Sequence, residues 1–217
     1  MFIGHFAPAL VLHRARPSVP LWVLFLATQA VDVLWSVFIL VGVEHARIVQ
    51  GFTESNALDL YDMPYSHSLA ATAVWTVVFA SLWAAFRPEH PREVPVVGLA
   101  VASHFVLDLV VHVPDLPLAS THGPLWGFGL WRHRELALMI ECAIFVAAAV
   151  FWRRARENRG VRSTVVLVVM TAYLVASYYV PSLPTPELMA VTSLSTFAVC
   201  ALGAWWAVSS SKALRLR

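Results

Sequence analysis

Six long apolar stretches constrain the fold of this chain more than any other feature of its sequence. A helix that crosses the hydrocarbon core of a bilayer needs about 20 mainly apolar residues. Charged residues make up only 13% of the chain, about half the share in an average soluble domain. This scarcity excludes a soluble globular fold, and the 12% aromatic content argues against disorder. The sequence predicts an all-α bundle of six transmembrane helices, over Leu21–Val43, His67–Phe86, Val94–Val113, Glu135–Trp152, Val161–Val180 and Leu188–Val208.

The N-terminal segment Phe2–Leu12 is apolar but too short to cross a bilayer. Basic residues follow it, and Pro17 ends its helical pattern. We expect a short helix that is either interfacial or half-inserted into the bundle. Because the chain carries no internal repeat or low-complexity tract, residues 1–217 are predicted to form a single transmembrane domain.

Basic residues are distributed unevenly between the segments that connect the six stretches. Twelve of the 15 Lys and Arg residues fall on one side of the predicted membrane, together with both termini. Since short cytoplasmic segments are enriched in Lys and Arg, we expect both termini in the cytoplasm. The other side carries two longer loops, Glu44–Ser66 and Pro114–Arg134, and the first is long enough to cover that end of the bundle.

The third stretch carries three ionisable residues at helical spacing. His104, Asp108 and His112 are four residues apart, so they form one stripe on a helix. Such groups are costly inside a membrane and point to function by default. Imidazole and carboxylate ligands one turn apart can bind one metal ion, and donors of this kind without thiolate suit zinc, manganese or iron. The alternative is a polar stripe that hydrogen-bonds to neighbouring helices.

Four further ionisable residues belong to the same hypothesis. Asp32 and His67 could complete a metal shell, although Asp32 could also pair with a neighbouring helix and His67 could simply begin a helix capped by Ser66 or Ser68. Glu141 is either a general base or an interhelical hydrogen-bonding group. His5 reaches the site only if the N-terminal helix enters the bundle. The candidate metal ligands are His5, Asp32, His67, His104 and Asp108, and the candidate bases are Asp32, Glu141 and His112.

The order of these motifs resembles a family of bacterial membrane-bound metal-dependent hydrolases, some of which are described as LexA-binding and inner-membrane-associated. The resemblance rests on Gly4-His5, on an Asp in the next helix, on Tyr65-Ser66-His67-Ser68 and on Ser103-His104-x-x-x-Asp108, and it covers residues 1–120. Residues 121–217 carry no motif of the family. The chain keeps one acid, Asp32, of the family's Pro-Asp-x-Asp-His element. It has Asp62 and Met63 where the family has His and Arg.

The resemblance implies metal-dependent hydrolysis in the bacterial inner membrane. The ligand order is also similar to that of zinc-dependent phospholipase C and nuclease proteins, which implies a phosphodiester substrate. We therefore expect a membrane-embedded hydrolase that uses a metal-activated water, with zinc the first choice, on a lipid or lipid-linked phosphoester. The alternatives are a protein that conducts protons or divalent cations, and a membrane protein with a structural metal. No nucleic-acid partner is expected, and the sequence does not indicate an oligomeric state.

Overall fold

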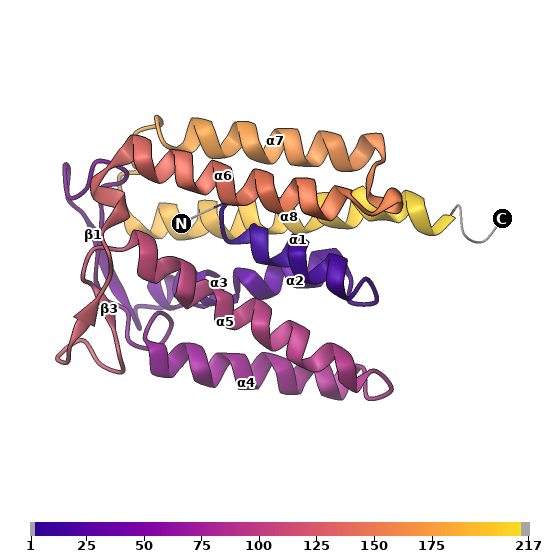
Figure 1. The fold of residues 1–217 in the computed structure, drawn as a ribbon. Coiled ribbons are helices and arrows are strands. Elements are labelled where there is room, and N and C mark those ends of the chain that lie inside the picture. Colours follow the sequence, from indigo (N-terminus) through magenta and orange to yellow (C-terminus); the bar gives the residue numbers. More distant parts are fainter. Residues whose placement is uncertain (1–2, 214–217) are drawn as a thin grey trace.

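The computed structural model describes residues 3–213, with side chains up to residue 209, so Phe2 of the expected N-terminal segment lies outside the described residues. The described chain is mostly helical, and its long helices run roughly along a common axis (Figure 1). Three short 3₁₀ helices, Pro91–Glu93, Leu130–Arg132 and Arg156–Asn158, lie in the connections. The α-helices of the described residues are α1 Phe6–Ala15, α2 Leu21–Thr28, α3 Ala30–Leu40, α4 Leu69–Phe86, α5 Val94–Val111, α6 Arg134–Arg153, α7 Val161–Ser177 and α8 Pro186–Ala213.

Two small antiparallel sheets lie at one end of the bundle, which we call the hairpin end (Figure 1). In the first, β1 (His45–Ile48) pairs with β2 (Leu58–Asp62) inside the loop that precedes α4. In the second, β3 (Leu116–Pro117) pairs with β4 (Leu125–Trp126) between α5 and α6. The expectation of an all-α fold is therefore corrected to a mostly helical fold with two short hairpins, because both long loops satisfy their backbone groups by pairing with themselves.

The prediction of six spans is wrong. Within the described residues, four helices are long and apolar enough to cross a membrane: α4, α5 with its 3₁₀ turn, α6 and α8. The pair α2 and α3 counts as a fifth span only if its two bent halves are taken together. Helix α7 has 17 residues, which is about 25 Å of helix at 1.5 Å per residue and falls short of a hydrocarbon core of about 30 Å.

The stretch Leu21–Val43, expected as one span, is broken at Gln29. Helices α2 and α3 meet there at an angle of 55°. Neither Pro nor Gly lies at the bend, but the Thr28 hydroxyl donates a 3.0 Å hydrogen bond to the Phe25 carbonyl. This type of bond from a Thr side chain to the preceding turn competes with the helical ladder and bends helices. The break places Asp32 in the first turn of α3, where the partial positive charge of the helix N-terminus favours a carboxylate.

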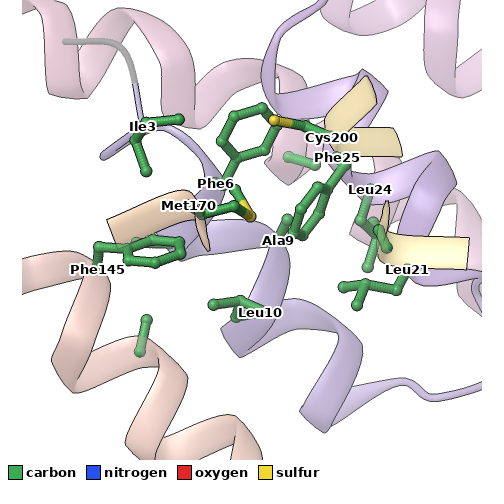
Figure 2. Close-up of a cluster of buried hydrophobic side chains, with 14 of the residues drawn as sticks. Ile3, Phe6, Ala9, Leu10, Leu21, Leu24, Phe25, Phe145, Met170 and Cys200 are labelled. Atoms are coloured by element: carbon green, nitrogen blue, oxygen red, sulfur yellow. The ribbon is translucent and has the colours of Figure 1, made fainter. Parts of the chain in front are cut away.

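Helix α1 lies inside the bundle, against α2, α5 and α6. Its Phe6 and Leu10 side chains are fully buried, and they sit among apolar side chains from helices that are far apart in the sequence (Figure 2). The rings of Phe6 and Phe25 are 4.6 Å apart, centre to centre. Of the two alternatives for the N-terminal segment, the structure supports the inserted helix, and this places His5 in the interior. The other labelled neighbours are Ile3, Ala9, Leu21, Leu24, Phe145, Met170 and Cys200.

Candidate metal centre

Asp108 lies at the centre of a buried cluster of histidines and carboxylates. Its Oδ2 atom is 3.0 Å from His104 Nε2 and 3.7 Å from His67 Nε2. Its Oδ1 atom is 3.2 Å from His5 Nε2 and 3.6 Å from His112 Nε2. All five side chains are almost completely buried. His104 and Asp108 on α5 and His112, the C-cap residue just after it, therefore form the stripe that the spacing predicts, and the stripe faces histidines from two other segments.

Asp32 supplies a second carboxylate to the same place. Its Oδ1 atom lies 3.2 Å from His67 Nε2 and 3.6 Å from His104 Nε2. Two sets of ligand atoms are compact enough to hold a metal ion, with all atoms of a set within 4.8 Å of one another. His104 belongs to both. The sets are His5, His104 and Asp108, and Asp32, His67 and His104.

The hydrogen bonds behind His104 and His112 fix which ring nitrogen carries the proton. His104 Nδ1 is 2.8 Å from the carbonyl oxygen of Thr28, at the break between α2 and α3. His112 Nδ1 is 2.8 Å from Asp115 Oδ1. Because a carbonyl and a carboxylate accept but do not donate, each Nδ1 carries the hydrogen. The Nε2 atoms of the neutral rings then present lone pairs to the cluster.

His67 is held in the same way, through a serine. The Glu44 carboxylate accepts hydrogen bonds from the backbone N–H groups of Tyr65 and Ser66, at 2.7 and 2.8 Å, and from the Ser66 hydroxyl at 2.6 Å. Since Ser66 has one hydroxyl hydrogen and gives it to Glu44, its oxygen must accept from His67 Nδ1, 2.7 Å away. In the neutral ring, His67 Nε2 then carries the lone pair, while in the doubly protonated ring it donates to Asp32 Oδ1, 3.2 Å away. Ser68 instead caps α4, where it accepts from the Ala71 N–H.

This arrangement fits a metal ion. Three Nε2 lone pairs converge on two carboxylates, so acceptors face acceptors, and only a cation or an added proton relieves their repulsion. His104 Nε2 is buried and makes no hydrogen bond within the described residues, although a carboxylate oxygen is 3.0 Å away. Neighbouring ligand atoms of a tetrahedral ion with bonds of about 2.0 Å lie about 3.3 Å apart, close to the separations observed here. Metal-binding histidines also typically donate their other N–H to an outer acceptor.

Glu141 takes part in the interhelical hydrogen bonding that was one of its two expected roles. Its Oε1 accepts from the Tyr178 hydroxyl at 3.0 Å, and its Oε2 accepts from the Gly4 N–H at 3.3 Å. The second bond holds the residue next to His5. Glu141 thus ties α6 to the segment that follows α7 and to the start of the chain.

A cavity of about 400 Å³ opens beside the cluster. Asp32, His67, Asp108 and His112 line one side of it. The opposite wall comes from α7, α8 and the segment between them, which carry no recognisable motif in the sequence. Side chains on this wall are mostly apolar or aromatic and include Tyr173, Tyr178, Pro181, Leu183 and Met189. The last helices therefore build half of the cavity.

Sequence reasoning missed the residues behind the histidines. Asp115 follows His112 by three residues, a spacing that could have suggested the pair. Ser66 was considered as a helix cap, but not as the hydrogen-bond partner of His67 Nδ1. Glu44 is 22 residues from Ser66 and carries no local signal. The Thr28 carbonyl could not be found from side-chain patterns, because any residue at the break would supply it.

The chain has no significant match among family models, curated proteins or solved structures. Fold and site together define a mostly helical protein with four to five candidate membrane spans and a buried His/Asp cluster that could hold a metal ion.

Proposed function

We propose that this protein is a membrane-embedded metal-dependent hydrolase that acts on a lipid or lipid-linked phosphoester. One observation carries the proposal: three histidine Nε2 atoms and two carboxylates converge beside a cavity that has room for a substrate group. A purely structural metal is usually enclosed by its ligands, whereas a catalytic site leaves access to one side. The resemblance of residues 1–120 to membrane-bound metal-dependent hydrolases supports the same assignment.

In this proposal Asp32, His67, His104 and Asp108 hold the ion. Their nitrogen and oxygen donors, with no thiolate among them, are compatible with zinc, which we propose ahead of manganese or iron. The bound metal would lower the pKa of a water molecule and polarise the phosphoryl oxygen. His5 Nε2 lies 3.3 Å from the His104 carbonyl, which can only accept, so His5 donates from Nε2 and orients the neighbouring Asp108 carboxylate.

His112 is the candidate general base that the geometry favours. Its ring lines the cavity, and Asp115 holds it by Nδ1, so Nε2 is the atom that can take a proton from water and return it to a leaving group. Asp32 is better placed as a ligand, because two histidine Nε2 atoms face its Oδ1. Glu141 is engaged by Tyr178 and Gly4, which favours a role in holding the cavity wall.

The cavity explains the choice of a lipid substrate. Most of its ionisable lining groups belong to the His/Asp cluster, while the lining from α7, α8 and the segment between them combines apolar and aromatic side chains with Ser and Thr hydroxyls. Such a site suits an amphiphile whose polar part meets the cluster and whose apolar part contacts the wall. A lipid can approach from the bilayer between helices, so its head group need not pass through a water-filled channel.

The test combines metal analysis with hydrolysis. Purified protein should contain stoichiometric metal by inductively coupled plasma mass spectrometry, and His104→Ala and Asp108→Ala should lose it. The loaded protein should hydrolyse a 4-nitrophenyl phosphodiester, whereas Asp115→Asn should keep the metal and lose most of the rate. Full metal content without hydrolysis of any phosphoester in a lipid panel would support a structural metal instead. A metal-free, fully stable protein would contradict both.

A further inference from the structure

The seam between α6 and α7 is an apolar groove on the surface of the bundle. Its lining consists mostly of valine, leucine and alanine side chains. Val168, on one wall, is 61% exposed. The two helices are antiparallel neighbours across this seam, along one edge of the bundle in Figure 1. The groove includes Val146, Val150, Leu167, Val168, Ala172 and Ala176.

The groove and the cavity beside the candidate metal centre share one lining residue. Ala176 lines both. Just beyond it, the hydrogen bond from the Tyr178 hydroxyl to Glu141 connects the ends of the two walls, and both of these residues line the cavity. Ala176 is therefore the point at which an extended chain from the cavity would enter the seam, below the Tyr178–Glu141 hydrogen bond.

The far end of the groove is polar. Arg153, the last residue of α6, donates a hydrogen bond from its guanidinium to the Thr164 hydroxyl on α7, and both residues line the groove. Twelve residues separate Thr164 from Ala176 on the same helix, which corresponds to about 18 Å at 1.5 Å per residue. The apolar part of the groove between Ala176 and Thr164, which we call the track, thus has a defined length between the cavity and a charged group.

Resting on the proposed function, we propose that this groove binds the hydrocarbon tail of the substrate while the phosphate lies in the cavity. The shared lining residue Ala176 favours this occupant, because the tail of a lipid whose phosphate lies in the cavity would reach the seam there. Burial of each methylene contributes favourably to binding, so affinity rises with tail length up to the length of the track. Beyond it, Arg153 and Thr164 oppose a longer apolar chain, because burying apolar carbon against them would desolvate a charged group.

Two neighbouring valines provide a matched test. Val168 lines the groove, while Val169 is outside it on the same helix and is equally exposed, at 59%. Val168→Trp fills the groove and Val169→Trp adds the same bulk elsewhere. Ala172→Leu is a smaller second obstruction that keeps the helix apolar. Chromatographic monodispersity and unchanged metal content select the folded variants for comparison.

The probes are hexadecyl phosphate with a diazirine near the end of its tail, hexadecyl 4-nitrophenyl phosphate and butyl 4-nitrophenyl phosphate. In the wild type and in Val169→Trp, photolabel should map by peptide mass spectrometry to α6 and α7. In Val168→Trp and Ala172→Leu, labelling should fall at least tenfold and KM for the hexadecyl diester should rise at least tenfold. The butyl diester should be hydrolysed equally by all four proteins.

Labelling that is equal in Val168→Trp and Val169→Trp would overturn the tail site. So would labelling of the groove by a diazirine-tagged hexadecanol as strong as that by the phosphate, because lipid would then fill the seam regardless of the metal centre. The two proposals fail separately. Hydrolysis of the butyl diester with no label in the seam refutes the groove alone, whereas groove labelling that depends on the phosphate, without any hydrolysis, supports the tail site and refutes the hydrolase.

Discussion

Glu44→Gln should weaken metal binding although Glu44 is not a ligand. In the wild type, the Ser66 hydroxyl donates to Glu44 Oε2 and accepts from His67 Nδ1, so the neutral His67 ring keeps its hydrogen on Nδ1 and has Nε2 available to a metal ion. A glutamine amide can donate to Ser66 from its nitrogen. Ser66 is then able to give its own hydrogen to His67 Nδ1, and the ring tautomer with the proton on Nε2 is favoured. That tautomer cannot bind a metal ion.

The expected loss of metal affinity follows from the position of the Glu44–Ser66 pair, directly behind a proposed metal-binding histidine. Loss of a partner that orients a metal-binding histidine typically costs a factor of about 10 to 100 in metal affinity, or about 1.4 to 2.7 kcal/mol. A fluorescent chelator in competition with the purified protein measures this ratio directly. Glu54→Gln is the matched control, because Glu54 lies in the same loop and its Oε2 accepts from the Arg134 backbone N–H, away from the site.

A double-mutant comparison separates the proposed path from general damage to the loop. Ser66→Ala should weaken metal binding by a similar factor, and Glu44→Gln should add little to it, because both changes act through the same ring nitrogen. Metal affinity of Glu44→Gln within twofold of the wild type would refute the reasoning, since the Glu44 and Ser66 bonds would then have no influence on His67.

Three further outcomes are expected. Asp115→Asn should lower kcat for phosphodiester hydrolysis by at least tenfold with unchanged metal content, as measured by steady-state kinetics alongside metal analysis, because it leaves His112 less firmly oriented; an unchanged kcat would rule out His112 as the base. Removal of metal by a chelator should lower the Tm in a thermal melt followed by intrinsic fluorescence, and readdition should restore it, because the ion binds only the folded cluster. Phe6→Ala should destabilise the fold by about 3 to 5 kcal/mol in denaturant unfolding, because Phe6 is fully buried against Phe25; a loss below 1 kcal/mol would show that α1 is not part of the core.

The stripe of His and Asp residues was predictable because it depends on one helix and the residue that caps it. His104, Asp108 and His112 share a face whatever surrounds them, and helical periodicity is sufficient to show it. Whether His5 reaches the cluster depends instead on whether α1 is buried. This is decided by the packing of α1 against α2, α5 and α6. The sequence therefore left two alternatives open for α1, an interfacial helix and an inserted one.

The number of spans and the cavity were harder to predict, for reasons visible at single residues. The helix break at Gln29 has no Pro or Gly to mark it, and the Thr28 back-bond that accompanies it is common in unbroken helices. Helix α7 ends at Ser177, three residues before the expected end at Val180, although the residues remain apolar. Tyr178 and Met189 line the cavity through tertiary contacts that leave no pattern along the chain.

The bend between α2 and α3 makes the candidate metal centre sensitive to the shape of a whole helix pair. The Thr28 carbonyl that orients His104 and the Asp32 carboxylate lie on either side of the break, within one turn of each other. A substitution that straightens this pair, even one that touches no ligand, would move the acceptor behind one ligand and the carboxylate of another at the same time. Metal affinity would consequently depend on the bend angle. Variants of distant residues on α2 can then be ranked by how strongly they change metal affinity.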